Sequence, residues 1–399
     1  MRKKELKQNS FLNGAFVATM EIVITKVLGM LYVIPFYAII GEQGGALYGY
    51  AYTIYLLFQS LSCAGIPNAI SKIISEYQTL GYSKAKEKAF KIGRRLAVFM
   101  GIFVFIILFL FAPIIAKAII GDLTGGNTLS DVTYVIRVIA TAILVVPILS
   151  IYRGYLEGHK FITPTAISQV VEQVARIVVI IAGSYAALNV FHLSLTTAVG
   201  VATFGATAGA LIGYLYLLDK VFKHKKEINN ITEVKDEPVI STKEILGKIF
   251  FYALPFIMID VFKSAYNFVD MTTLVKTLVH SAGYTTVAAE NSMSVISTWG
   301  NKLNMIIVSI STGIIISLIP NLTSSSVKGD KKDVHHKINQ TLQILLFLSV
   351  PMTIGLSFLS QPVWDVFYGN KSAVGAEIMA YYIFVALIIS TYTALVSIV

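Results

Sequence analysis

Long runs of apolar residues, separated by short polar stretches, dominate the chain. A helix needs about 20 apolar residues to cross the ~30 Å hydrocarbon core of a bilayer, and more when it is tilted. Ten segments meet this requirement, at residues 11–40, 46–76, 95–120, 130–153, 162–187, 194–219, 248–277, 289–320, 338–360 and 374–399. They are too long and too uniformly apolar for the strands of a membrane barrel. The pattern predicts an all-α, polytopic bundle of transmembrane helices.

Composition agrees with lipid as the surrounding solvent. Of the 399 residues, 55% are apolar and 14% are charged, against roughly 25% charged in an average soluble domain. The first apolar stretch is far longer than the core of a signal peptide and ends in no small-residue cleavage site, so we interpret it as the first span. The single cysteine, Cys63, excludes an intramolecular disulfide.

The net charge of +10 is explained by where the basic residues lie. They gather at the amino terminus and in every second loop, near residues 72–95, 153–160, 220–248 and 328–337. The alternate loops, such as 41–47 and 121–131, contain almost none. By the positive-inside rule, this alternation predicts a cytoplasmic amino terminus. It also makes nucleic acid an improbable partner.

The one long polar connection, at residues 220–247, divides the chain into two predicted lobes. Residues 1–219 would form the amino-terminal lobe with six spans, and residues 248–399 the carboxyl-terminal lobe with four. A short internal repeat supports this division. The second span ends in Gly65-Ile-Pro-Asn-Ala-Ile-Ser71, and the eighth ends in Leu318-Ile-Pro-Asn-Leu-Thr-Ser324. An even number of spans separates the copies, as expected for parallel repeats in a transporter.

Several charged residues fall inside the predicted spans, where each costs at least ~2.5–3.5 kcal/mol and therefore suggests a function. The basic ones are Lys26, Arg137, Arg176, Lys263 and Lys302. Arg176 follows Glu172 by four residues and Lys263 follows Asp260 by three, so each pair can meet on one helix face. A structural ion pair and a ligand-binding role both remain open for these two pairs. Arg137 lies near a span end and can extend its charge to the headgroups.

Lys26 and Lys302 have no acidic residue at the neighbouring positions of their own helices. Either they pair with an acid on another helix, with Glu21, Asp270 and Glu290 as candidates, or they face a wet cavity that receives an anion. An ion bound near Asp260 or Asp270 could couple such transport. Gly29 and Pro35 are candidate hinge residues, as are Pro67 and Pro320.

Motifs for enzymatic chemistry are missing from the sequence. The run Gly121-Asp-Leu-Thr-Gly-Gly lacks the Gly-Lys-Ser/Thr ending of a nucleotide-binding loop. His335 and His336 lie in a Lys-rich loop, where solvation is favoured over metal binding, and no catalytic triad has credible spacing. We therefore expect neither an enzyme nor a cofactor nor a metal site.

Three blocks of sequence resemble MurJ-type lipid II flippases, in particular the YtgP and stage V sporulation protein B branch. They are Thr25-Lys-Val-Leu-Gly29 with Gly44-Gly-Ala-Leu-Tyr-Gly-Tyr50, then Tyr152-Arg-Gly-Tyr-Leu-Glu-Gly158, and Gly300-Asn-Lys-Leu303. These flippases belong to the multidrug/oligosaccharidyl-lipid/polysaccharide (MOP) exporter superfamily. The resemblance implies two lobes around a cationic cavity that opens alternately to each face of a bacterial plasma membrane.

The same resemblance places family cations of the first and eighth helices at Lys26 and Lys302. Two further cavity arginines of well-known members have no basic counterpart, since those positions read as Tyr32 and about Gln59–Ser60. Members of the family continue beyond the point where this chain stops, so the second lobe is expected to be incomplete.

From these observations we expect a flippase whose partner is a polyprenyl-linked anionic glycolipid, lipid II. Lys26, Lys302, Lys263 and Arg176 are the candidate substrate-binding cations, and Asp260, Asp270, Glu172 and Glu21 are candidates for ion coupling or charge pairing. An exporter of another lipid-linked oligosaccharide is the nearest alternative, and a membrane-embedded glycosyltransferase or polymerase is a more distant one. Membrane lipids and cell-wall synthesis proteins are further expected partners.

Overall fold

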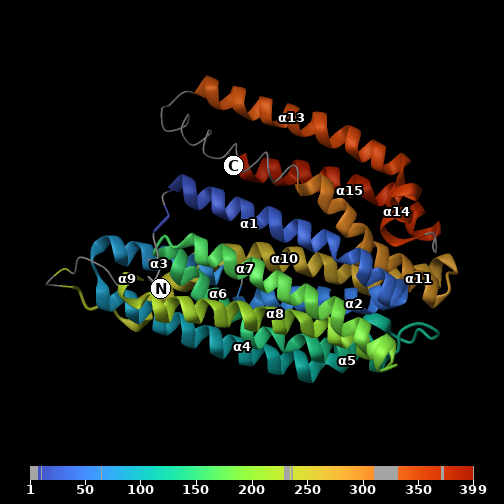
Figure 1. Cartoon of the computed structure of the whole chain (residues 1–399), viewed down its shortest axis with the longest axis horizontal. Helices are drawn as coiled ribbons and strands as arrows, with labels where there is room; N and C mark the ends of the chain where they lie inside the picture. The colour runs from blue at the N-terminus through green and yellow to red at the C-terminus, as the bar shows by residue number, and fades with distance from the viewer. Residues whose placement is uncertain are drawn as a thin grey trace.

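The computed structural model describes residues 8–9, 11–63, 65–228, 234, 237–309, 331–369 and 373–398. Within these residues the regular secondary structure is entirely helical, with no strands, as the apolar pattern predicts. The long helices lie lengthwise beside one another and form an elongated bundle (Figure 1). The prediction of an all-α membrane bundle is confirmed.

The helices follow the predicted spans closely. They are α1 (Phe11–Leu31), α2 (Val33–Cys63), α3 (Ile66–Leu80), α4 (Ser83–Ile120), α5 (Leu129–Ala140), α6 (Ala142–Gly158), α7 (Ile162–Val178), α8 (Leu195–Lys223), α9 (Lys225–Ile228), α10 (Thr242–Ala282), α11 (Thr286–Ser294), α13 (Lys331–Phe358), α14 (Ser360–Tyr368) and α15 (Ala373–Ile398). Three π-helical turns, η1 (Val179–Gly183), η2 (Ala186–Val190) and η3 (Val295–Trp299), extend α7 and α11.

Within the described part of the chain, seven helical segments are long and apolar enough to span a bilayer by themselves. They correspond to the third to seventh, ninth and tenth predicted spans. The first two predicted spans form a bent pair, Phe16–Leu31 with Val33–Leu80, with an angle of 47° between its helices. The eighth begins as α11 and η3 and continues helically to residue 309, and its remainder lies outside the described residues.

The bent pair also contains a kink inside α2. Gly41 has φ of 64° and ψ of −166°, so α2 consists of two helices joined at this residue. A positive φ of this kind favours glycine, which has no Cβ to clash with its own backbone. The break falls at the start of the predicted loop 41–47.

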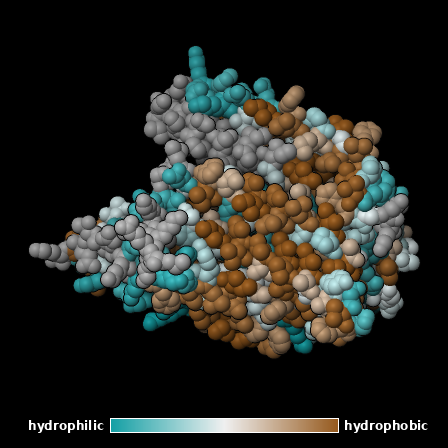
Figure 2. All heavy atoms as spheres, in the orientation of Figure 1, coloured by the Kyte–Doolittle hydropathy of each residue, from teal (hydrophilic) through white to brown (hydrophobic). Residues whose placement is uncertain are grey.

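Apolar side chains face outward around the middle of the bundle. Figure 2 shows a hydrophobic surface across the centre, with hydrophilic residues gathered at both ends. On α4 the exposed apolar residues include Phe99, Phe103, Leu110 and Ile114, and α10 contributes Phe251 and Ile259 among others. An apolar surface of this extent suits lipid rather than water.

Two bundle ends are defined by the connections between helices. The basic end carries the turns between α3 and α4 and between α6 and α7, together with the segment that connects α8 to α10. The far end carries the turns between α4 and α5, η2 and α8, and α10 and α11. At the basic end, the Glu237 carboxylate accepts hydrogen bonds from the backbone N–H groups of Lys84 and Ala85, at 2.9 and 2.6 Å. This contact holds the connecting segment against the first turn of α4.

The proposed hinge residues differ in their surroundings. In the first span the helix is interrupted at Tyr32, between Gly29 and Pro35, which is the stretch where the sequence suggests a hinge. Pro67 lies in the first turn of α3, where its missing N–H leaves no hydrogen bond unmade. Gly65 precedes it with φ of 71°, and a Cβ there would lie 2.6 Å from the carbonyl oxygen of Ala253 on α10. Pro320 lies outside the described residues.

Candidate functional site

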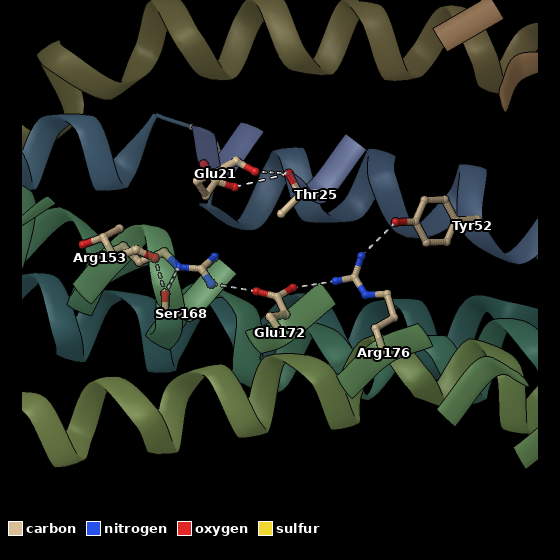
Figure 3. Close-up of polar contacts among 8 residues, drawn as sticks. Glu21, Thr25, Tyr52, Arg153, Ser168, Glu172 and Arg176 are labelled. Atoms are coloured by element: carbon tan, nitrogen blue, oxygen red, sulfur yellow. Dashed lines mark hydrogen bonds and ion pairs between the residues drawn. The ribbon is translucent and has the colours of Figure 1, made fainter. Parts of the chain in front are cut away.

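Two arginines share one carboxylate inside the amino-terminal part of the bundle (Figure 3). Arg153 of α6 donates from Nη2 to Oε2 of Glu172 at 2.8 Å, and Arg176 donates from Nη2 to Oε1 of Glu172 at 2.5 Å. All three side chains are largely buried, with 13–17% of each exposed. The pair Glu172–Arg176 uses the four-residue spacing noted in the sequence.

A neutral group accepts one further hydrogen bond from each guanidinium group. Arg153 Nε donates to Ser168 Oγ at 3.1 Å, and Arg176 Nη1 donates to the Tyr52 hydroxyl at 3.3 Å. The network therefore connects α2, α6 and α7. Sequence reasoning missed Arg153 because its position near a basic loop indicated a topology signal, and it missed Tyr52 because aromatic residues are abundant throughout the chain.

This geometry defines what Arg176 can do. Its charge is already offset by Glu172, and its planar group is held at a fixed orientation by Tyr52. A buried network of this kind stabilises one arrangement of helices, since the loss of any member leaves an uncompensated charge. The structure thus brings Arg176 and Glu172 together in one hydrogen-bonded network, with Arg153 as its third charged member.

Helix α1 packs against α7 beside this network. Glu21 is buried there, and the Thr25 hydroxyl donates to the Glu21 backbone carbonyl at 2.9 Å and reaches its Oε1 at 3.4 Å. Lys26 follows on the same helix and is half-buried. Figure 3 shows Glu21 and Thr25 facing the side on which Arg153 and Glu172 lie.

Lys302 reaches across from the carboxyl-terminal part of the bundle to the first span. Its Nζ lies 5.6 Å from the centre of the Tyr32 ring, and its side chain is half-buried. A cation over an aromatic face is attracted by the negative face of the ring. Within the described residues, no carboxylate lies within 4 Å of its ammonium group.

The charged residues of α10 are placed differently. Lys263 and Asp260 are exposed, and Asp270 is half-buried. Although Asp260 and Lys263 are three residues apart, they are not among the ion pairs within 4 Å in the described part of the chain. Such a pair contributes only about 0.2–0.5 kcal/mol, too little to hold two exposed side chains together.

Glu290 of α11 contacts α2 and the loop between α4 and α5 at the far end. It is only 1% exposed, and its Oε2 accepts from both the backbone N and the Nδ2 of Asn127, each at 2.9 Å. Its Oε1 lies 3.5 Å from the Tyr50 hydroxyl. A Cβ on Gly126 would lie 2.5 Å from Oε2, so only glycine lets the loop approach this closely. Among the described residues, Glu290 therefore does not pair with a lysine, which was one of the two possibilities, and its carboxylate binds neutral donors instead.

Next to these contacts of Glu290, close packing holds the helices together toward the middle of the bundle. The Thr298 hydroxyl donates to the Gly45 carbonyl at 3.1 Å, and a Cβ on Gly45 would overlap the Trp299 ring. Trp299 is fully buried and packs edge-on against Tyr37 with ring centres 5.1 Å apart. The glycines of the Gly44–Tyr50 block therefore allow α2 to lie directly against α11 and η3.

The basic end, by contrast, contains an open groove of about 650 Å³. Its lining comes from one face of α3 and from Glu157 of α6: Asn68, Ser71, Lys72, Ser75, Glu76, Thr79, Leu80 and Glu157. On the adjoining side, Glu76 accepts from Lys248 Nζ at 2.8 Å, and Lys72 Nζ lies 3.9 Å from the centre of the Tyr252 ring. These contacts join α3 to α10 next to the groove.

Comparison with known proteins places this arrangement in a family. The polysaccharide biosynthesis protein family matches residues 11–324. A protein of Bacillus subtilis (strain 168) named lipid II flippase MurJ is 36% identical over 392 residues, which cover 96% of this chain and 71% of that protein. The chain belongs to the MurJ family of polysaccharide biosynthesis proteins. The resemblance noted in the sequence is confirmed.

Two further Bacillus subtilis proteins are similar to this member of the MurJ family. Stage V sporulation protein B is 24% identical over 94% of this chain and 70% of its own length. The membrane protein YabM is 29% identical over 93% of this chain and 66% of its own length. The chain thus spans about two-thirds of the length of these relatives.

Solved structures show the MOP fold of the MurJ family. An inward-facing multidrug resistance transporter of the MATE family matches with a TM-score of 0.68 at 13% identity, covering 96% of this chain and 87% of that one. A structure named lipid II flippase MurJ in the inward closed conformation matches with a TM-score of 0.65 at 15% identity, covering 95% of this chain and 76% of that one. A multi-pass membrane protein with a transporter fold follows, and the enzyme alternative has no support among these matches.

Proposed function

We propose that this chain moves a polyprenyl-pyrophosphate-linked cell-wall precursor, lipid II, from the inner to the outer leaflet of a bacterial plasma membrane. The Bacillus subtilis relative named lipid II flippase MurJ supports the substrate. The observation that carries the proposal is Lys302, a half-buried cation that reaches from the carboxyl-terminal part of the bundle to Tyr32 of the first span.

The chemistry of the cargo explains why such a protein is needed. Each unpaired hydroxyl or amide of a glycan costs a few kcal/mol in hydrocarbon, so the headgroup cannot cross by itself. A polar passage between helices supplies hydrogen-bond partners while the polyprenyl chain stays in the lipid. Lys302 would offset the charge of the pyrophosphate, with Lys26 on the first span as a second cation. Lysine suits this role as a compact point charge.

The two ends of the bundle suggest the direction of entry. The basic loops indicate that the basic end faces the cytoplasm. At that end lies the groove of about 650 Å³, whereas Glu290 and Trp299 close the far end. The headgroup would enter from the cytoplasm, and the far-end contacts would break when the passage opens outward. We propose residues 1–219 and 248–399 as the two lobes that rock in this step, with residues 220–247 as their linker.

Two sources of energy remain as proposals. An inside-negative membrane potential favours the outward movement of an anion by ~2.3 kcal/mol per charge per 100 mV. An ion bound near Asp260 or Asp270 of α10 is the other. Asp270 is the better placed of the two, because it is half-buried whereas Asp260 is exposed.

Another lipid-linked oligosaccharide, such as a capsule or teichoic-type unit, is the alternative cargo. The description of the matching family, polysaccharide biosynthesis protein, supports this alternative. Rescue of a host whose own lipid II flippase has been depleted would identify lipid II as the cargo. Failure to rescue, with the protein present in the membrane, would favour the alternative. Contacts with cell-wall synthesis proteins are part of the proposal for lipid II.

The role of Lys302 is tested in the same depleted host. Lys302→Gln removes the charge but keeps most of the side-chain volume, and we expect the rate of lipid II exposure on the outer face to fall at least tenfold. Lys302→Arg retains the charge and should keep most of the activity. Lys276→Gln serves as a control, because the Lys276 Nζ at the far end of α10 donates to the Ala118 carbonyl. Normal exposure of lipid II in the Lys302→Gln variant, at equal protein levels, would contradict the proposal.

A further inference from the structure

The groove at the basic end owes its polar character to the two faces of α3. Ile66, Ile70, Ile73, Ile74 and Tyr77 bury one face against the bundle. The groove receives the opposite face, on which Asn68, Ser71, Ser75 and Thr79 follow one another at helical spacing. Because the apolar face fixes the rotation of α3, the row of amide and hydroxyl groups cannot turn away from the groove.

The two charged groups of α3 in the groove already have partners. Lys72 lies over the Tyr252 ring, and Glu76 binds Lys248. The Thr79 hydroxyl donates to the Ser75 carbonyl at 2.8 Å. The side chains of Asn68 and Ser71 make no hydrogen bond to another described residue, so their donors and acceptors are available to a ligand.

Glu157 differs from the other charged residues of the groove. It projects from the last turn of α6, four residues after Arg153, and is half-buried. The guanidinium group of Arg153 is already bound by Ser168 and Glu172, so it cannot fully offset the charge of Glu157. Among the described residues, no basic group lies within 4 Å of the Glu157 carboxylate. In the described part of the chain, the groove therefore presents a carboxylate with no ion-pair partner within 4 Å, beside the neutral hydrogen-bonding groups of α3 and with Lys72 as the one basic residue of its lining.

We propose that this groove binds the sugar and peptide portion of the headgroup, with Glu157 receiving a primary ammonium group and with Asn68 and Ser71 bonding to hydroxyl or amide groups. The inference rests on the proposed function and specifies one part of its substrate: a glycan that carries an amine-bearing peptide. A volume of about 650 Å³ suits such a group.

The two charged sites would then orient the cargo. A carboxylate at Glu157 repels a pyrophosphate and attracts an amine, whereas Lys302 does the reverse. Opposite charges placed at separate points give orientation and selectivity more than affinity. A glycolipid that lacks the amine would lose the contact with Glu157 but keep the contact with Lys302.

The experiment compares two forms of one precursor on the purified protein in lipid nanodiscs. The first is lipid II with a free amine on its peptide, and the second is the same molecule with that amine acetylated. For the unaltered protein we expect acetylation to weaken binding roughly tenfold, as for the loss of a hydrogen bond to a charged group. This arm requires no substitution, so folding of a variant does not affect it.

The Glu157→Gln variant then tests whether Glu157 is the residue that binds the amine. It should bind both forms equally, at the level of the acetylated form on the unaltered protein. Glu87→Gln is the matched control, because Glu87 lies at the same end, outside the groove and paired with Lys91 at 2.8 Å. It should retain the full difference between the two forms.

The outcomes separate this inference from the proposed function. Equal binding of both forms by the unaltered protein, or an undiminished difference in Glu157→Gln, would overturn the amine site and leave lipid II transport standing. If neither form bound at all, the proposed cargo itself would be wrong, and the amine site with it.

Discussion

At the scale of single residues, the carboxylate of Glu172 is held by two arginines at once. Its two oxygens bind one guanidinium each, and the three side chains come from only two helices, α6 and α7. Two arginines could not stay close together in a poorly hydrated interior without it, because like charges repel strongly where the dielectric constant is low. Its first role is therefore structural.

We predict that Glu172→Gln destabilises the purified protein by about 3 kcal/mol or more, as expected when one partner of a buried ion pair is removed. Reversible unfolding in detergent measures the change. Glu87→Gln, which removes an exposed partner of Lys91, should have little effect. A stability for Glu172→Gln equal to that of Glu87→Gln would show that water reaches the two guanidinium groups and that the network is not buried.

At the scale of elements, the contact of α2 with α11 and η3 depends on glycines of α2 that let the facing side chains approach. Gly45 leaves room for the Trp299 ring, and Gly49 lies against Ser297. Beyond them, the loop at Asn127 closes over Glu290. Hydrogen bonds from neutral donors satisfy this carboxylate without a cation, so the closure can open without leaving a separated ion pair.

We predict that Glu290→Ala weakens this closure and exposes the interface to the far side. A cysteine replacing Ser297, in a Cys63→Ser background, should react several-fold faster with a membrane-impermeant maleimide when Glu290 is replaced. Asp122→Asn, an exposed carboxylate substitution at the same end, should leave the rate unchanged. Unchanged labelling in Glu290→Ala would mean that packing of Trp299 alone keeps the interface closed.

At the scale of the whole molecule, the charge asymmetry between the two ends sets the predicted orientation. Lysines and arginines cluster at the basic end, and the loop between α4 and α5 carries none. Because short basic loops are retained on the cytoplasmic side, the groove beside α3 should face the cytoplasm. The outer hydrophobic surface seen in Figure 2 fits the same placement across the bilayer.

The orientation is checked with single cysteines at the two ends, again in a Cys63→Ser background. Thr124→Cys, in the loop at the far end, should be labelled by an impermeant maleimide in intact cells. Lys84→Cys, at the start of α4, should be labelled only after the membrane is permeabilised. The reverse pattern would place the groove outside and contradict inward-to-outward transport of the headgroup.

The sequence predicts local features well, because they depend on neighbours along one helix. Span positions follow from the length of apolar runs, and the approach of Arg176 to Glu172 follows from helical spacing. For Asp260 and Lys263 the same spacing permits a pair, but both side chains are exposed, and exposure does not favour holding them together. Helical spacing also gave no sign of Arg153 as a member of the network, since Glu172 lies on a different helix.

By itself, the sequence determined that this protein is a bundle of membrane-spanning helices with its basic loops on one side, because lipid imposes length, apolarity and charge placement on every span separately. Only the tertiary structure decided which charged side chains are bound by ion-pair or hydrogen-bond partners and which face a groove or the surface. Glu290 meets Asn127 across 163 positions of the chain, and Lys302, which follows η3, lies near the Tyr32 ring of the first span. Such contacts depend on how helices pack against one another, and no local pattern encodes that packing.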